Sequence, residues 1–352
     1  MLLTAFHPSC NLLGISSVSG NASIAHTTSN TLALLSSFGL TTTDVPVVRG
    51  ASKPLTRPIN FAPEIHGKTG LDGVPLLPSV QPSFVESVPS GVKYIAAAIL
   101  KEEKDQVWIV ATGPLTTVAL LFREFPEVRA HIRGLSVMGG AIGDVPVSPS
   151  SSTSTTTETE TEAKTAPFSS TAPPHRRDGK GNWTPHAEFN IWCDPEAASQ
   201  VLGSLQTLRK PVILIPLDLT HQVRGTADVQ ALLFSSQSNI REMFKQILLY
   251  FASTYSEHSG IHDGPPLHDP LAVFAVLEAD AFDDWGGERW VVSVDCSEGP
   301  RAGETVAVPV QRQEGNEAVG GGVKIPRSVD LKRFWGAVDD ALSAVEKKLN
   351  DR

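Results

Sequence analysis

The feature that most constrains the fold of this chain is an alternation of short, valine- and isoleucine-rich runs with helical patterns. Strands are predicted over 11–20, 45–50, 107–113, 134–141 and 211–220, and helices over 23–39, 92–104 and 114–125. Alternation of this kind predicts an α/β fold, a mostly parallel sheet with helices on both faces. Residues 289–310 predict an added β-hairpin, and residues 328–349 a terminal amphipathic helix.

The length and hydrophobic content are enough for a large core. The chain has 352 residues, of which 41% are hydrophobic, so one large α/β domain or two smaller ones are both possible. We expect a single domain over residues 1–352, interrupted at 147–181. That segment is rich in Ser, Thr and Pro and has almost nothing to bury, so we predict a disordered insertion there. A phosphorylated linker is the alternative interpretation.

Charge and cysteine content narrow the class of protein. The formal net charge of −9 argues against a nucleic-acid partner, because such proteins carry a basic face. No apolar run approaches the ~18 residues of a membrane span, and the opening residues lack the basic start of a signal peptide. The cysteines Cys10, Cys193 and Cys296 are far apart and odd in number, which predicts reduced thiols in a cytoplasmic protein.

The stretch TPHAEFNIWCDPEAA, residues 184–198, contains an unusual pair of polar residues. Its second half begins a helix, with Asp194 as N-cap before a proline and an acidic residue. In its first half, Glu188 and Asn190 flank an aromatic residue. In an extended segment residues i and i+2 point to the same side, so the carboxylate and the amide would face one place. A solvated edge and a pair that holds hydroxyl groups are the two interpretations.

Other polar groups follow predicted strands or open helices. They lie in SGN (19–21), EIHGKTGLDG (64–73), ATGPLTT (111–117), VMGGA (137–141) and DGPPLHDPLAV (263–273). Each has a simpler explanation: Asn21 as a helix cap, for which Ser23 is the other candidate, His66 as a loop imidazole, and Asp269 as a cap before a proline. In an α/β sheet, however, ligands bind beyond the carboxyl ends of the strands, where these groups would meet.

Several common chemistries are not supported. The chain contains no GxxxxGK[ST] phosphate loop, no GxGxxG opening a helix after a strand, no GxSxG elbow and no HExxH. Cys193 lies beside a helix cap with no evident base, so a thiol nucleophile is not predicted.

Seven blocks in order resemble one known family. They are LLGISSVSGN, EIHGKTGLDG, ATGPLTTVAL, VMGGA, GNWTPHAEFNIWCDPEAA, LDLTHQV and GPPLHDPLAV. The chain is similar to the inosine–uridine-preferring nucleoside hydrolases over roughly residues 7–280, apart from the insertion. The resemblance implies a Rossmann-like fold and hydrolysis of the N-glycosidic bond of ribonucleosides with a bound calcium ion. It also implies a homo-oligomer.

The resemblance assigns roles to individual residues. His268 matches the imidazole proposed to protonate the leaving base. The substrate-binding matches are Asn21, His66, Met138, Asn182, Glu188, Asn190 and Tyr255, of which Tyr255 is a lid residue. The calcium matches are Thr112, through its carbonyl, and Asp269, through its carboxylate. Calcium prefers six to eight oxygen ligands and would acidify a bound water. The oxocarbenium-like transition state needs stabilisation of charge on both sugar and base.

The sequence departs from the family at one place. Family members begin with a strand that ends in DxDPGxDD, whose carboxylates supply most calcium ligands and the base, and no such motif is present here. Two interpretations stay open: an incomplete version of an active hydrolase, or a short form that has lost catalysis. We expect little or no hydrolase activity from residues 1–352 alone. A ribose-binding pseudoenzyme or interaction protein is the alternative function.

Overall fold

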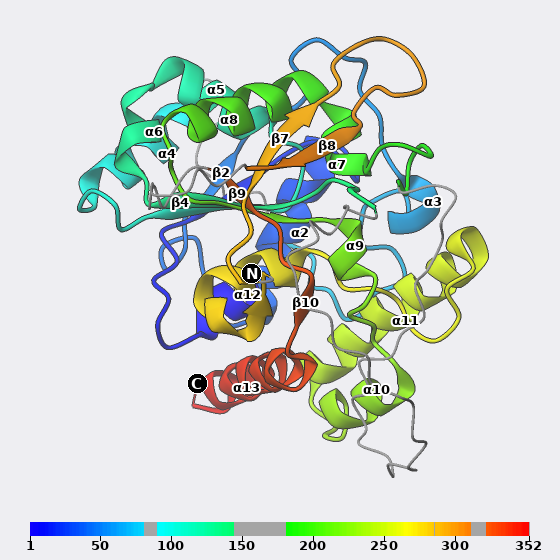
Figure 1. Ribbon diagram of the computed structural model, residues 1–352. Helices are drawn as coiled ribbons and strands as arrows, with labels where there is room; N and C mark the ends of the chain where they lie inside the picture. Colours follow the sequence, from blue (N-terminus) through cyan, green and yellow to red (C-terminus); the bar gives the residue numbers. More distant parts are fainter. Residues whose placement is uncertain (81–89, 144–180, 285, 311–321, 352) are drawn as a thin grey trace.

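The fold is organised around a mixed six-stranded sheet (Figure 1). The computed structural model describes residues 1–80, 90–143, 181–284, 286–310 and 322–351. The strand order is β3-β4-β5-β9-β7-β8. Strands β3 (Trp108–Ala111), β4 (Gly134–Met138) and β5 (Val212–Ile215) are parallel, as predicted, and β9 (Val323–Lys324) adds a parallel strand that was not predicted. The hairpin of β7 (Trp290–Val294) and β8 (Thr305–Pro309) joins antiparallel and confirms the expectation for 289–310.

Four further strands form two small sheets. β1 (Ile15–Ser17) and β2 (Val47–Arg49) pair in parallel, and β6 (Phe282–Asp283) pairs antiparallel with β10 (Ser328–Val329). The two-stranded β1–β2 sheet is not hydrogen-bonded to the six-stranded sheet in the described residues. The central layer therefore has a break between β1 and β3.

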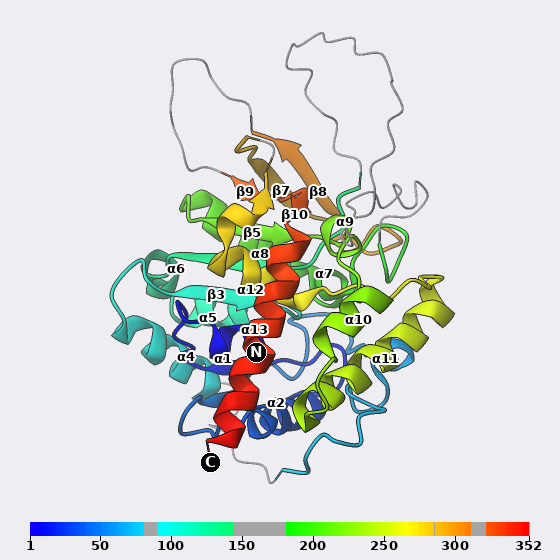
Figure 2. The same ribbon diagram turned by 90° about the horizontal axis from the view of Figure 1, so that it is seen from below.

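Helices cover both faces of the large sheet. One face carries α4 (Ser90–Lys101), α5 (Thr116–Glu124), α6 (Glu127–His131) and α8 (Pro195–Thr207), and the other carries α1 (Leu2–Phe6), α12 (Asp269–Leu277) and α13 (Leu331–Asn350) (Figures 1 and 2). The remaining helices are α2 (Ile24–Ser37), α3 (Pro63–His66), α7 (Phe189–Cys193), α9 (Leu217–Thr220), α10 (Ala227–Leu233), α11 (Asn239–Ser259) and the 3₁₀ turn Ala279–Ala281.

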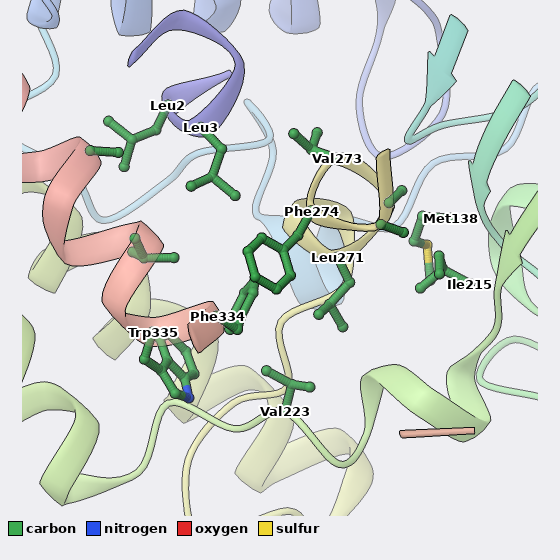
Figure 3. Packing of buried hydrophobic residues seen from close by; sticks show 14 of the residues in the cluster. Leu2, Leu3, Met138, Ile215, Val223, Leu271, Val273, Phe274, Phe334 and Trp335 are labelled. Carbon is green, nitrogen blue, oxygen red and sulfur yellow. The ribbon is translucent and has the colours of Figure 1, made fainter. Parts of the chain in front are cut away.

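Helix α12 forms the centre of one hydrophobic layer. Its residues Leu271 and Phe274 are fully buried between the sheet and α13, where Phe334 and Trp335 meet them (Figure 3). Phe334 stacks edge-on against Phe274 with ring centroids 5.4 Å apart. Because α12 starts at Asp269, this packing fixes the position of the residues that begin the helix.

Local capping accounts for several helix starts. Ser23 accepts a bond from the backbone of His26 at the start of α2, so the cap is Ser23 and not Asn21. Asp194 caps α8 as predicted, and its buried carboxylate also accepts from the Thr116 hydroxyl at 2.6 Å. Buried carboxylates need such donors, because an unpaired buried charge is costly.

Two predicted extended segments are helical instead. The run 211–220 ends as a strand at Ile215, and after Pro216 the residues Leu217–Thr220 form α9. Residues Phe189–Cys193 form α7, so the prediction of an extended segment around Glu188 and Asn190 is wrong. The predicted insertion 147–181 falls outside the described residues except for Gly181. Among the described helices none is long and apolar enough to cross a membrane.

Candidate active site

Glu188 is a buried carboxylate held by backbone donors. It caps α7, and its Oε1 accepts from the backbone N–H of Asn190 at 2.8 Å, while Oε2 accepts from Ile191 at 3.0 Å and Gly140 at 3.1 Å. Its side chain is only 2% exposed. Burial raises the pKa of Glu188 to about 7, against the opposing effect of the three donors, and the negative charge of Asp269 raises it further. The carboxylate is therefore oriented by its surroundings.

Asn190 lies in the same buried cluster. Its Nδ2 donates to the carbonyl oxygen of Met138 at 3.3 Å and contacts the Met138 sulfur at the same distance. Met138 is the last residue of β4, and its burial places the amide at the carboxyl end of that strand. Glu188 and Asn190 thus converge near β4, although through a helix and not through an extended segment.

Asn182 approaches this cluster from the preceding loop. Its Oδ1 accepts from the backbone N–H of Phe189 at 2.9 Å. The residue as a whole is exposed, in contrast to the buried pair that it adjoins. Its amide nitrogen is therefore the part of this loop that can meet a ligand.

His268 stands between two hydroxyl groups. Its Nε2 lies 2.7 Å from the Tyr255 hydroxyl, and its Nδ1 lies 2.7 Å from the Thr220 hydroxyl. Burial, and then the nearby imidazoles of His221 and His66, lower the pKa of His268 well below its usual value. His268 is consequently a neutral imidazole with both ring nitrogens engaged.

Asp269 follows directly and begins α12. The residue as a whole is exposed to solvent, yet desolvation of its carboxyl group raises the pKa of Asp269 to about 6. The positive amino group of Met1 opposes this shift. Because water reaches the carboxylate, solvation offsets part of that rise. Its charge raises the pKa values of Glu188 and Tyr255, which shows that the three groups share one region.

Three predicted site residues are less closely connected. His66 ends α3, and its ring packs edge-on against Phe251 at 5.3 Å, with burial lowering its pKa to about 4. Asn21 is tied by its backbone, since its carbonyl accepts from Ala62 at 3.2 Å. Thr112 follows β3 and lines the cavity beside β1. Of these, only His66 acts on the central cluster, through its effect on His268.

The structure adds Thr220, which sequence reasoning did not assign, and gives Asp218 contacts with the backbone. Thr220 contacts His268, and Asp218 accepts from the backbone of Ile142 at 2.8 Å and of Gly143 at 2.6 Å. Both lie in LDLT, a block quoted for the resemblance without individual roles. The proline that precedes this block was the available signal that a strand ends there and a polar turn begins.

The described donors do not fit a calcium ion. Calcium takes six to eight oxygen ligands. In the parts of the chain that the structure describes, no three His, Cys, Asp or Glu side chains are grouped so that they could hold a metal. Asp269 supplies one carboxylate and Thr112 one carbonyl, which is too little negative charge and too few oxygens. No chemical step is therefore assigned to calcium.

Comparison with known proteins identifies the family. The profile of the inosine-uridine preferring nucleoside hydrolases matches residues 1–336. The uridine nucleosidase of Saccharomyces cerevisiae is 30% identical over 355 residues, covering 99% of this chain and 92% of that protein. The pyrimidine-specific ribonucleoside hydrolase RihA of Salmonella arizonae is 34% identical over 293 residues, covering 83% of this chain and 78% of that protein.

Solved structures agree in fold. A purine-preferring ribonucleoside hydrolase from Gardnerella vaginalis superposes with a TM-score of 0.74 at 23% identity, covering 99% of this chain and 95% of the other. A plant nucleoside hydrolase gives a TM-score of 0.74 at 21% identity, covering 97% and 93%. The order of the seven sequence blocks, the α/β architecture and the full-length relatives all agree. The chain belongs to the inosine-uridine preferring nucleoside hydrolase family.

Proposed function

We propose that the protein hydrolyses the N-glycosidic bond of ribonucleosides to free base and ribose. The observation that carries the proposal is one polar region in which the hydrogen-bonded set Tyr255–His268–Thr220 lies within electrostatic reach of Glu188 and Asp269. Membership of a family of nucleoside hydrolases gives the reaction class. The residues around the region suggest which groups bind the ribose and which act on the base.

The cluster at β4 and α7 is proposed to hold the ribose. Glu188 and Asn190 offer an acceptor and a donor side by side, as neighbouring sugar hydroxyls require, and Asn182 adds an amide from the loop. Backbone donors fix Glu188 before the substrate arrives, so little ordering is left for the binding step. A fixed sugar places the anomeric carbon for attack, which lowers the entropic part of the barrier.

His268 is proposed to act on the departing base. As a neutral imidazole it carries one N–H, which it can give in a hydrogen bond to a base that gains negative charge. The Tyr255 hydroxyl contacts Nε2 of His268, so this hydroxyl is positioned to exchange places with the base. His66 completes an aromatic and imidazole wall with Phe251.

Uridine is the first substrate to examine. The relatives that cover most of this chain are named for uridine and for pyrimidine ribonucleosides, and one structural neighbour is named for purines. The proposal therefore covers ribonucleosides as a class. A cytoplasmic location and a homo-oligomeric state stay predictions from the sequence.

Ribose release separates the two candidate functions. The protein is incubated with uridine, inosine and 2′-deoxyuridine, free ribose is measured, and binding is followed by the thermal shift that a bound ligand produces. Release of ribose from a ribonucleoside supports hydrolysis. Binding without release supports the ribose-binding pseudoenzyme, which the poor calcium donor set favours. A protein that neither binds nor cleaves any of the three contradicts both functions.

A further inference from the structure

Thr220 and His268 lie together because the segments next to them in the chain are paired. Residues 223–225 and 265–267 run antiparallel, and the two backbone hydrogen bonds between them are 2.8 and 2.9 Å long. Thr220 ends α9 shortly before the first segment, and His268 follows the second and precedes α12. The backbone therefore fixes the 2.7 Å contact between the Thr220 hydroxyl and Nδ1 of His268.

The hydrogen atoms at this contact can be assigned by counting donors and acceptors. A neutral imidazole has one N–H and one bare nitrogen, whereas a hydroxyl can donate one hydrogen bond and also accept. Among the described residues, the Thr220 hydroxyl has Nδ1 of His268 as its only hydrogen-bond partner, and the Tyr255 hydroxyl has Nε2. Three protons therefore share two contacts, and one hydroxyl proton is left over.

The two tautomers of His268 differ in which hydroxyl proton is left over. With the ring proton on Nε2, Thr220 donates to Nδ1, the Nε2–H donates to the Tyr255 oxygen, and the tyrosine proton remains. With the ring proton on Nδ1, Tyr255 donates to Nε2, and the threonine proton remains. A doubly protonated ring would leave both hydroxyl protons without an acceptor in this set.

The surroundings of the two hydroxyls decide between the tautomers. Thr220 is 0% exposed, so water cannot accept a leftover proton there, whereas Tyr255 is 8% exposed. Burial, and then the charges of Asp269 and Glu188, raise the pKa of Tyr255, so the tyrosine lies near the carboxylates of the candidate site. A buried donor without an acceptor is destabilising. The tautomer that leaves over the tyrosine proton, with Nε2 protonated, is therefore favoured.

We propose that Thr220 is a positioning residue, whose hydroxyl donates to Nδ1 and thereby holds His268 as the Nε2–H tautomer. The hydrogen bond at one ring nitrogen sets which nitrogen carries the proton. The N–H then points at the Tyr255 hydroxyl, where the departing base is proposed to lie. A bare Nε2 could only accept a hydrogen bond there and could not stabilise negative charge on the base. This consequence rests on the proposed function, whereas the tautomer itself can be measured without a substrate.

Nitrogen-15 NMR of the imidazole rings distinguishes the tautomers directly. Residues 1–352 are labelled with ¹⁵N-histidine, and two-bond ¹H–¹⁵N correlations are recorded at neutral pH for the parent, Thr220→Val, Thr220→Ser and Tyr255→Phe. The signals of His268 are those that His268→Gln lacks. A protonated ring nitrogen and a bare one have widely separated ¹⁵N shifts, so each spectrum reports which nitrogen carries the proton.

The parent should show a protonated Nε2 and a bare Nδ1. Thr220→Val keeps the shape of the side chain but removes the donor, so both tautomers leave Nδ1 unpaired. The ratio of the Nε2–H to the Nδ1–H form should then fall about tenfold, as the loss of one hydrogen bond predicts. Thr220→Ser should restore the parent spectrum. Tyr255→Phe should keep the proton on Nε2, because Thr220 still donates to Nδ1.

Thr254→Val is the matched control. The Thr254 hydroxyl donates to the Phe251 carbonyl at 3.1 Å and has no contact with an imidazole, so its loss should leave the His268 tautomer unchanged. A change in this control as large as that in Thr220→Val would overturn the proposal, because it would show that any lost threonine hydroxyl disturbs the ring.

Three other outcomes would also overturn the proposal. They are a parent ring with the proton on Nδ1 or on both nitrogens, a move of the proton to Nδ1 in Tyr255→Phe, and a parent-like ratio in Thr220→Val. The parent spectrum decides the first of these even if Thr220→Val fails to fold. A protein with the Nε2–H tautomer that releases no ribose would support this proposal and count against the hydrolase function, so the two can fail separately.

Discussion

The two sides of the candidate active site differ in how fully their polar groups are paired. On the side of β4 and α7, Glu188 accepts hydrogen bonds from three backbone N–H groups, and Asn190 donates to the Met138 carbonyl. On the side of β1 and β3, residues of both strands line an open cavity of about 1060 Å³. The first side is organised by hydrogen bonds that include pairs 48 and 52 residues apart in the sequence, and the second borders open space. Each of the following predictions tests this difference.

The largest expected effect is on ribonucleoside turnover. Asn190→Ala removes a donor from the organised side. In a catalytically complete version of the protein we expect it to lower kcat/KM for uridine by roughly 100-fold or more, because sites built around a substrate hydroxyl depend strongly on the paired group. Loss of the bond to Met138 should cost about 1–3 kcal/mol of unfolding free energy, so the protein stays folded. Steady-state kinetics and urea unfolding measure the two effects.

Asn239→Ala is the matched control, because Asn239 is exposed at the start of α11. It should leave uridine turnover unchanged. The assignment to ribose would be wrong if the parent protein cleaved uridine and 2′-deoxyuridine equally well.

The next effect concerns stability against pH. The pKa of Glu188 is about 7 in the folded protein, above the ordinary value of 4.5 that the unfolded chain has. Between these values the unfolded chain has lost a proton that the folded protein keeps, so stability falls as pH rises through this window. The loss is about 3 kcal/mol at 1.36 kcal/mol per pKa unit. Glu188→Gln lacks the titration.

Urea unfolding between pH 4 and 8 measures this effect. As pH rises, the unfolding free energy of the parent should fall relative to that of Glu188→Gln. Parallel curves for the two proteins would show that Glu188 titrates normally and that the organised side is more open to water than its 2% exposure indicates.

A smaller effect is expected where α11 reaches His268. Tyr255→Phe removes the hydroxyl that lies 2.7 Å from Nε2, and we expect a loss of about 1 kcal/mol of unfolding free energy, typical of one hydrogen bond. Tyr250→Phe on the same helix is the control, since Tyr250 is only partly buried. Equal losses from the two substitutions would show that the bond to His268 adds no stability.

The smallest effect is expected from shortening the chain at residues 147–181. Replacing them with a short Gly/Ser bridge changes loop-closure entropy by about 0.6 kcal/mol per doubling of length. The melting temperature should therefore stay within about 3 °C. A calorimetric scan of both forms tests this, and a fall of ten degrees would show that the segment stabilises the body of the protein.

The fold was largely predictable because it follows from hydrophobic patterning. The apolar runs in β4 and β5 are buried in a parallel sheet, and such strands are nearly continuous in apolar residues. The error at Leu217–Thr220 arose because leucines continue the apolar run beyond Pro216, so composition concealed the change to a helix. The proline, and not the hydropathy, marked the end of the strand.

The site was predictable in its members but not in its connections. Polar residues at strand ends indicated Glu188, Asn190 and His268, and the resemblance gave them roles. The bonds from Thr220 to His268 and from Gly140 to Glu188 span 48 residues each, and no local pattern encodes a pairing at that separation. The short α7 was missed because five residues are too few to show a helical period.

The anchoring of the chain on both sides of residues 144–180 has an evolutionary consequence. Before that segment, Asp218 clamps the backbone of Ile142 and Gly143, and after it, Ala187 forms a bridge with Glu304 of the β7–β8 connection. The two clamps fix the chain independently of the number of residues between them. We therefore expect insertions and deletions between the clamps to leave Glu188 in register, so relatives could differ in the length of this segment without displacing the neighbouring site.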